Sequence, residues 1–308
     1  MTDVKSLIMN KNGMASMQLA KRFLCIKVGE KIPTFSDLSV DLDIARGTLQ
    51  NAMKLLQSTS AIEVETKGHL GTFLTYKNTK LLCEFADIHS LVGVMPLPYS
   101  KHYEGLATGI IASMKNEYEL PVNLAYMRGA KKRISMLHEG RYDFAIVSKL
   151  AAIEALHEGD SIKMIKEFGA KSYLSNHVLV FFDQSKKEIS NHMRVGIDRD
   201  SFDQAILTMK VTSSFEVEYV DLKYNQIINK LLAGEIDAAV WNEDEIKDQY
   251  SNINYVSIPL ENEYDTIAAI IVRDDCIELC HILDEIIDVE KVLSIQQDVA
   301  SGKMIPSY

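Results

Sequence analysis

The segment 46–57 carries polar side chains that can donate or accept hydrogen bonds, among them Arg46, Thr48, Gln50, Asn51 and Lys54. Between them stand four apolar residues at the i, i+3, i+4, i+7 spacing of a helix, Leu49, Ala52, Met53 and Leu56. An apolar stripe of this kind faces a core and leaves the polar side chains to solvent. Guanidinium, ammonium, hydroxyl and amide groups are the groups that contact phosphates and base edges in a major groove. The segment therefore predicts an amphipathic helix whose outer face binds DNA.

A short helix and a turn lead into this segment. Thr34 followed by Asp37 three residues later is typical of a helix N-terminus, because each side chain can hydrogen-bond to the backbone of the other residue. The helix that starts there carries Leu38 and Leu42 one turn apart, and residues 43–45 form the turn. The succession indicates a helix-turn-helix.

A small hairpin follows the second helix. Residues 62–65 alternate as a strand, 66–71 turn and 72–74 return. A preceding helix at 14–28 has an apolar face of Met17, Ala20 and Leu24 that can close the core. Residues 1–76 are therefore predicted to form an α+β winged helix-turn-helix domain.

These positions resemble the DNA-binding domain of GntR-type transcriptional regulators. The residues that match the pattern of that family are Gly29, Ile32, Pro33, Thr34, Asp37, Leu38, Leu42, Ile44, Ala45, Arg46, Thr48, Leu49, Ala52, Met53, Leu56, Ile62, Gly68, Gly71, Thr72 and Phe73. The long wing turn, G-H-L-G, is most similar to the YhfZ-like branch of the group. The resemblance implies operator contacts at Arg46, Thr48, Gln50 and the wing tip, Gly71. Ser36 stands where such proteins often carry an arginine, so that contact is not expected here.

The charge is distributed unevenly along the chain. Residues 1–80 contain eleven Lys or Arg and seven Asp or Glu, a balance of +4, whereas the other 228 residues contain 22 and 36, a balance of −14. An acidic protein as a whole would not suit nucleic acid, but a basic head on an acidic body does. The distribution favours DNA binding by the first domain.

No N-terminal apolar stretch resembles a signal peptide, and no run approaches the ~20 apolar residues of a membrane span. We expect a cytoplasmic protein with no membrane partner, in which the cysteines are reduced. Cys276 and Cys280 lie one helical turn apart beside His281, and such a group can bind metal. No second ligand pair has matching spacing, so buried apolar cysteines are favoured and no metal site is assigned.

Residues 77–87 are expected to form a linker and a connecting helix, and residues 88–308 a second domain. From Leu91 on, strands alternate with helices, which is typical of α/β folds. The pattern L-x-x-G-x-x-D-x-A-[IV] occurs at 137–146 and again at 231–240. The repeat predicts two similar α/β lobes; the alternative is two unrelated βα units that share a local pattern.

This body resembles the type 2 periplasmic-binding-protein fold, which is also the effector domain of LysR-type regulators. The resemblance implies that the chain crosses between lobes near residues 173 and 266, with a ligand cleft between the lobes. Lobe I would comprise 88–172 and 266–308, and lobe II 173–265. The expected fold class is therefore α/β with an N-terminal α+β winged helix.

Ligands of open α/β sheets bind beyond the carboxyl ends of the strands, often at helix N-termini. The residues that the predicted strands deliver there are Ser100, Lys101, Arg128, Gly129, Ser148, Ser201, Trp241 and Asn242. Ser100, Arg128 and Ser148 suit a carboxylate or a phosphate, which favours an anionic ligand. Trp241 either stacks on the ligand or packs in the core of lobe II, and the sequence leaves both open.

Known catalytic motifs are absent from the sequence, so no catalytic residue and no cofactor is assigned. The acidic runs Glu243–Glu245 and Asp284–Glu285 are predicted to lie on exposed helix faces. The chain is thus expected to be a non-enzymatic, one-component transcriptional regulator that binds a double-stranded operator and a small-molecule effector. The family implies a homodimer. The competing classes are an enzyme that acts on its ligand and a scaffold that does not bind DNA.

Overall fold

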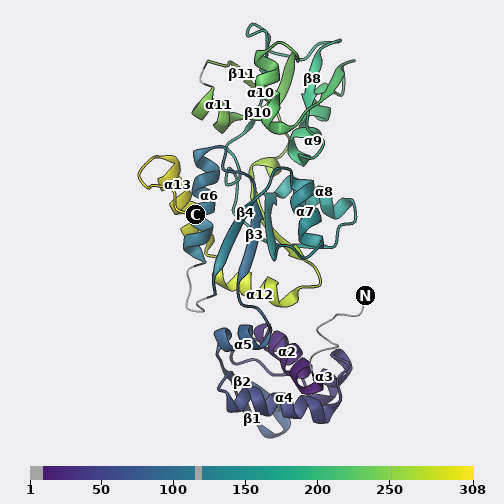
Figure 1. The fold of residues 1–308 in the computed structure, drawn as a ribbon, viewed down its shortest axis with the longest axis vertical. Helices are drawn as coiled ribbons and strands as arrows, with labels where there is room; N and C mark the ends of the chain where they lie inside the picture. Colours follow the sequence, from purple (N-terminus) through teal and green to yellow (C-terminus); the bar gives the residue numbers. More distant parts are fainter. Residues whose placement is uncertain (1–9, 115–119, 251) are drawn as a thin grey trace. The chain divides into compact units, whose positions relative to one another are not determined.

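The computed structural model describes residues 10–114, 120–250 and 252–308 of the chain. The chain forms two compact units (Figure 1). Of the described residues, the first contains 10–91, 120–121 and 276–285. The second contains 92–114, 122–275 and 286–308. Each unit has its own core and is described by itself.

The described part of the first unit begins with the helices α2 (Lys11–Leu24), α3 (Phe35–Asp41) and α4 (Arg46–Ser58). Helix α3 begins with the predicted capping box, in which the Asp37 backbone N–H donates to the Thr34 hydroxyl and the Thr34 backbone N–H donates to the Asp37 carboxylate. The pKa of Asp37 is lowered because the Thr34 hydroxyl and the Thr34 backbone N–H both donate to its carboxylate. The apolar stripe of α4 is fully covered: Leu49, Ala52, Met53 and Leu56 are all buried.

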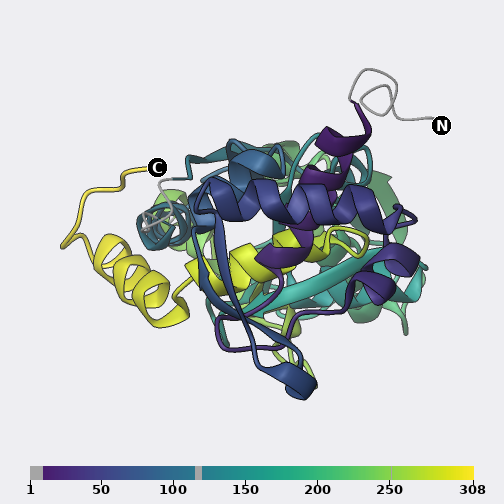
Figure 2. The same cartoon turned by 90° about the horizontal axis from the view of Figure 1, so that it is seen from below.

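The hairpin consists of β1 (Ile62–Thr66) and β2 (Thr72–Lys77), which pair antiparallel. The 3-10 turn η1 (Gly68–Leu70) lies at its tip, and Figure 2 shows the hairpin extending beside α4. Lys31 adds a bridge to Phe73 of β2. The unit is therefore the winged helix-turn-helix that the sequence predicts.

The expected linker is ordered structure. Strand β2 runs to Lys77, whose ammonium group donates to the carbonyls of Leu24 and Ile26, and Asn78 caps helix α5 (Thr79–Phe85). Helix α5 belongs to the first unit, and so does α12 (Ile277–Ile286) up to residue 285. The segment expected to be a linker and a connecting helix, residues 77–87, thus begins with the last residue of β2 and contains helix α5. The limits of the domains stay a prediction.

The second unit contains two five-stranded sheets. The first has the order β4-β3-β5-β12-β6, with the strands Val122–Tyr126, Leu91–Met95, Phe144–Ser148, Ala268–Arg273 and Ile162–Glu167. Strands β3 and β5 are parallel, whereas β12 runs antiparallel to both of its neighbours. Strand β12 follows all the strands of the second sheet in the sequence. The first sheet is therefore completed by a strand from near the end of the chain.

The second sheet has the order β11-β7-β10-β8-β9, with the strands Tyr255–Ser257, His177–Phe181, Ala238–Asn242, Arg194–Ile197 and Glu218–Asp221. Strand β8 is parallel to β9 and β10, and β7 is antiparallel to β10 and β11. The two copies of the repeat, at 137–146 and 231–240, both run from a helix through a glycine into a central strand, β5 or β10. The two lobes therefore share this succession of helix, glycine and central strand, as the repeat predicts.

Helices cover both sheets. Helices α7 (Ala130–His138) and α8 (Lys149–His157) lie on one face of the first sheet, and α6 (Lys101–Ser113) and α13 (Val289–Ala300) lie on the other (Figure 1). The helices of the second sheet are α9 (Phe202–Thr212), α10 (Tyr224–Leu232) and α11 (Glu243–Gln249). The sequence analysis did not foresee α8 or β6. Helix α6 ends at Ser113, and residues 115–119 lie outside the described part.

The chain crosses between the sheets twice, and the two crossings are hydrogen-bonded to each other. The backbone N–H of Tyr173 donates to the carbonyl of Thr266 at 2.7 Å. His177 and Asp265 form a buried pair with 2.6 Å between Nδ1 and Oδ2. The 3-10 turn η2 (Tyr264–Thr266) shapes the second crossing. These contacts fix the point at which the two sheets meet.

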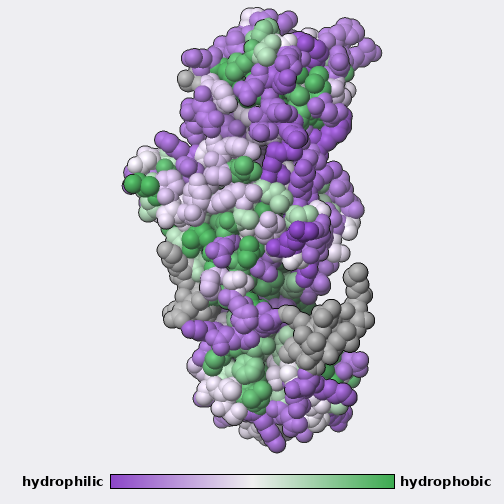
Figure 3. Space-filling model, viewed as in Figure 1, coloured by the Kyte–Doolittle hydropathy of each residue, from purple (hydrophilic) through white to green (hydrophobic). Residues whose placement is uncertain are grey.

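The face drawn in Figure 3 is covered mainly by hydrophilic residues, with hydrophobic residues in small groups. Among the helices of the described residues, none combines the length and the apolar character that crossing a membrane requires.

Gly109 provides a test of how closely α6 and α13 pack. A Cβ atom added at Gly109 would lie 2.6 Å from the carbonyl oxygen of Val292, which belongs to the backbone and cannot rotate away. Gly109→Ala should therefore destabilise the second unit by roughly 1–3 kcal/mol, as overpacking usually does. Thermal unfolding measures this, with Lys101→Ala, an exposed position of the same helix, as the control. Equal melting temperatures for Gly109→Ala and the wild type would contradict the packing.

Candidate functional site

The outer face of α4 is open to solvent. Arg46, Gln50, Asn51 and Lys54 are exposed, and Thr48 is half-buried. Among the described residues, no carboxylate lies within salt-bridge distance of Arg46 or Lys54, although Asp and Glu are common in this chain. Two cations without partners on a helix with a buried opposite face can contact phosphates without first breaking an ion pair.

The wing adds cations that the sequence analysis did not select. Gly71 has φ +102°, and a Cβ there would lie 2.4 Å from Cε of Lys31, so the Lys31 side chain lies against the wing turn. Lys67 and His69 are exposed in the same turn. Lys67 is partly neutralised by Glu65, with 3.2 Å between the ammonium and the carboxylate. Lys31 is distant from the wing in sequence, and its bridge to Phe73 of β2 brings it to the wing.

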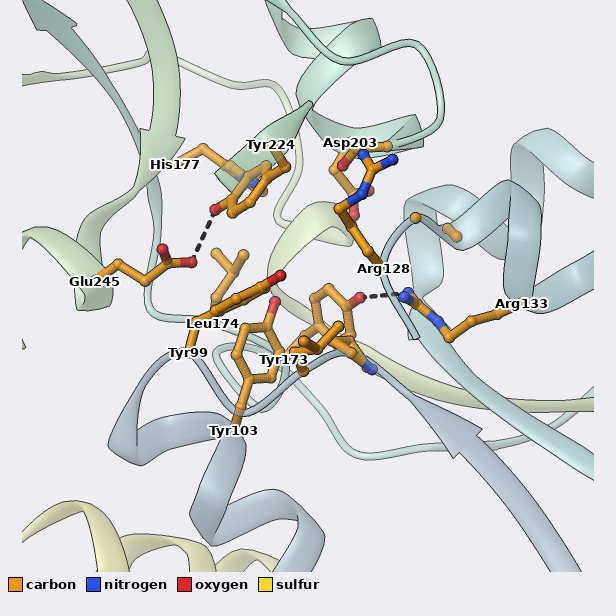
Figure 4. A pocket seen from close by; sticks show the side chains of 15 residues that line it. Tyr99, Tyr103, Arg128, Arg133, Tyr173, Leu174, His177, Asp203, Tyr224 and Glu245 are labelled. Atoms are coloured by element: carbon orange, nitrogen blue, oxygen red, sulfur yellow. Dashed lines mark hydrogen bonds between the residues drawn. The ribbon is translucent and has the colours of Figure 1, made fainter. Parts of the chain in front are cut away.

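The second unit contains a pocket with about 520 Å³ of empty space, a volume that includes its open mouth. Residues from both sheets line it, including the segments after β3 and β4, the first crossing, and helices α7, α9, α10 and α11. Four tyrosines form its centre, Tyr99, Tyr103, Tyr173 and Tyr224 (Figure 4). The pocket is therefore mainly aromatic, with charged groups at its ends.

The aromatic rings pack against one another. Tyr103 meets Tyr173 edge to face, with ring centroids 5.3 Å apart, and Tyr99 lies 6.0 Å from Tyr224. Tyr224 stacks on Trp241 at 4.0 Å, with 14° between the ring planes. Trp241 itself is 3 % exposed and belongs to the core of the second lobe. It therefore supports Tyr224 from behind and does not line the pocket.

Arg128 is held by two carboxylates. Its guanidinium pairs closely with Asp198, and a second nitrogen lies 3.4 Å from Asp200. Asp198 also accepts the backbone N–H of Tyr224, which begins α10. The charge of Arg128 is thus largely compensated within the protein, and this weakens the case for an anionic ligand at this position.

Arg133 is 2 % exposed and lies near the start of α7. Its guanidinium donates to the carbonyls of Ile146 and Met127 and to the hydroxyl of Tyr173. Within the described residues no carboxylate pairs with it. Its role in this structure is to join α7, β5 and the first crossing, as the dashed contact to Tyr173 in Figure 4 shows in part.

Glu245 lies at the opposite end of the tyrosine cluster from Arg133 (Figure 4). It is 4 % exposed, and the Tyr224 hydroxyl donates to it at 2.9 Å. No Lys, Arg or His among the described residues pairs with it. Burial raises the pKa of Glu245 to about 8, with Asp244 and Asp248 adding to the rise. The prediction that the run Glu243–Glu245 is an exposed face is therefore wrong at its last residue, which the turn of α11 directs inward.

Ser148 and Asp203 form a second buried polar contact. The Ser148 hydroxyl donates to Asp203 at 2.5 Å and accepts the backbone N–H of Ala151 as the cap of α8. Burial raises the pKa of Asp203 to about 6, against the lowering effect of His177 and of the Ser148 hydrogen bond. Asp203 lines the pocket, whereas Ser148 does not.

Three of the ligand-binding residues that the sequence analysis selected line the pocket, Arg128, Gly129 and Ser201. Three others, Ser100, Ser148 and Asn242, are buried caps of α6, α8 and α11, which use their side-chain oxygens for backbone N–H groups. Lys101 is exposed outside the pocket, and Trp241 is in the core. The sequence analysis missed Glu245 and the tyrosines, for which only their positions after strands or at helix starts gave a signal.

No group of three or more His, Cys, Asp or Glu side chains in the described part of the chain is arranged to hold a metal ion. Near α12, Cys280 is buried and Cys276 is half-buried.

Comparison with known proteins identifies both parts of the chain. Residues 27–74 match a helix-turn-helix domain, and residues 78–308 match the YhfZ C-terminal domain. The "Uncharacterized protein YhfZ" of Escherichia coli (strain K12) is 33% identical over 309 residues, covering 99% of this chain and 100% of that protein.

Solved structures agree with this assignment. The crystal structure of YhfZ from Shigella flexneri is 34% identical, with a TM-score of 0.62, and covers 74% of this chain and 97% of that one. The amino acid ABC transporter substrate-binding protein AbpA from Streptococcus pneumoniae, solved with L-arginine bound, is 14% identical with a TM-score of 0.51, over 70% of this chain and 97% of that one. The latter similarity shows the fold alone. The predicted fold class, a helix-turn-helix head before a two-lobed binding-protein fold, is confirmed, and the chain belongs to the YhfZ family.

Proposed function

We propose that the protein is a DNA-binding transcriptional regulator whose operator affinity is changed by a small molecule in the pocket of the second unit. The observation that carries the proposal is the exposed cationic face of α4, on a matched helix-turn-helix domain, in one chain with a binding-protein fold. We propose further, as the GntR-like pattern suggests, that it works in the cytoplasm as a homodimer on a two-fold operator. The body would bind its ligand without converting it.

Helix α12 is the element that supports coupling between the two functions. It belongs to the first unit, but the chain enters it from β12 and leaves it toward α13, both of which belong to the second unit. Lys21 of α2 pairs with Glu278 of α12 at 2.6 Å, and the Glu278 side chain is only 13% exposed. A ligand that binds one state of the second unit better than another would shift the populations of both units through such a connection.

The expectation of an anionic effector is not carried into this proposal. It depended on Ser100, Arg128 and Ser148, and the structure uses these groups for helix caps and for ion pairs with Asp198 and Asp200.

The test of DNA binding starts with selection of a binding sequence from random duplexes by the full-length protein. Arg46→Ala should then weaken binding to the selected duplex by ~1–3 kcal/mol, the usual loss for one base or phosphate contact. Because Arg46 is exposed and makes no ion pair among the described residues, the melting temperature should not change. Fluorescence anisotropy and thermal unfolding give the two readouts.

Arg141→Ala is the matched control, since Arg141 is an exposed arginine of the second unit that pairs with Glu139. It should bind the selected duplex as the wild type does. The proposal fails if no sequence is enriched, or if Arg46→Ala binds as tightly as the wild type at moderate salt.

Coupling through α12 is testable without knowing the effector. Operator DNA should change the amide hydrogen exchange of α10 and α11 in the wild type, and Glu278→Gln should reduce that change while the protection of α4 persists. The reason is that the substitution removes the charge that pairs with Lys21 and leaves the DNA-binding face intact. Glu290→Gln, an exposed position of α13, serves as the control. An unaltered response in Glu278→Gln would show that this contact carries no coupling.

A further inference from the structure

We propose that the pocket binds an organic cation, an alkylammonium or guanidinium group, which is held by the Glu245 carboxylate among the faces of Tyr99, Tyr103 and Tyr224. This inference rests on the proposed function only in taking the pocket as the effector site. It replaces the anionic ligand expected from the sequence by one of opposite charge.

The first argument is the absence of a protein cation at Glu245. A buried carboxyl is usually paired, because removing an isolated charge from water is costly. Glu245 is 4 % exposed and receives one hydrogen bond, from the Tyr224 hydroxyl, and no cation among the described residues pairs with it. Of the other acids near the pocket, Asp198 pairs with Arg128 and Asp265 pairs with His177, whereas Asp203 receives a hydrogen bond from the Ser148 hydroxyl.

The second argument is the aromatic surroundings. Tyrosine faces carry negative quadrupole potential and attract cations within about 6 Å of the ring centroid. Tyr224 is held in place by Trp241 on one face, with 4.0 Å between the ring centroids, and Tyr99 lies 6.0 Å from it. A carboxylate beside rigid aromatic faces is suited to a desolvated ammonium or guanidinium group and repels an anion.

The start of α11 accounts for the inward position of the Glu245 carboxyl. The Asn242 amide caps α11 through the Asp244 N–H at 2.8 Å, and this fixes the phase of the helix that turns Glu245 inward. Within this seven-residue helix Glu245 is buried beside the apolar Ile246. The inward carboxyl destabilises the empty pocket, and a bound cation would offset that destabilisation.

Binding should also release a proton. The pKa of Glu245 in the empty pocket is raised to about 8, so the carboxyl is mainly neutral at pH 7, and a cation favours its ionised form. Cation affinity should therefore increase with pH until about pH 8, by up to roughly tenfold per pH unit. The titratable groups that face Glu245 or act on it are Tyr99, Tyr103, Tyr224, Asp244 and Asp248. Asp203, with a pKa of about 6, is a second group of the pocket that ionises in this range.

The experiment uses full-length wild type, Glu245→Gln and Glu188→Gln. The probes are putrescine, agmatine, L-lysine and L-arginine, with glutarate as the anion, and the readouts are thermal shift, calorimetry and fluorescence of Trp241, the only tryptophan of the chain. At least one amine should bind the wild type, and Glu245→Gln should weaken it by roughly ten- to 100-fold, as expected for a lost hydrogen bond to a charged group. Glu188 is an exposed acid of the same lobe, and Glu188→Gln should bind as the wild type does.

Proton release by the wild type provides a readout that does not depend on the Glu245→Gln variant. Calorimetry of the wild type in buffers of different ionisation enthalpy should show net release below pH 8, and Glu245→Gln should lose the part that belongs to this carboxyl, leaving that of Asp203. The proposal is overturned if none of the amines binds, if only glutarate binds, if Glu245→Gln binds the amine as tightly as the wild type, or if binding releases no proton. If an amine binds but operator affinity does not respond to it, the proposed regulation fails and the ligand class stands.

Discussion

The two chain crossings that lie side by side in the second unit are the contact on which its architecture depends. Tyr173 donates its backbone N–H to Thr266, and the His177–Asp265 pair is buried next to it. Because strand β12 returns through the second crossing, the first sheet is completed by a strand that follows the whole second sheet in the sequence. The ligand pocket is a consequence, since Tyr173 and His177 of the first crossing are part of its wall.

The pocket combines rigidly packed aromatic rings with charged groups that differ in the partners they have within the protein. Arg128 and Arg133 are engaged by carboxylates, carbonyls and a tyrosine hydroxyl, and so they act mainly as structural cations. Glu245 is stabilised by one tyrosine hydroxyl, and burial raises its pKa to about 8. This difference is the basis of the proposal that the pocket prefers a cationic ligand. The stacking of Tyr224 on Trp241 connects that preference to the core of the second lobe.

The sequence was most informative where local pattern and tertiary role coincide. Helix α4 was predicted to within one residue because its apolar stripe and its polar face repeat with the helical period. The capping box at Thr34 and the glycines of the two repeats depend on local backbone geometry, and they could also be predicted from the sequence. Glu245 was missed because the run Glu243–Glu245 has the composition of a solvated face, and only the phase of α11 in three dimensions turns one carboxyl inward. Ser148 and Asn242 were assigned to the ligand because a helix cap and a ligand contact require the same residue types at the same ends of strands.

The proposed link between the pocket and α4 is a coupling free energy. Such coupling is reciprocal: if a ligand changes operator affinity by some factor, the operator changes ligand affinity by the same factor. The most direct measurement is a calorimetric titration of the full-length protein with the tightest-binding amine, in the absence and in the presence of saturating operator DNA. A regulator with one ligand-sensitive state should show Kd values that differ by about fivefold or more between the two titrations. Equal Kd values with and without operator would contradict the account.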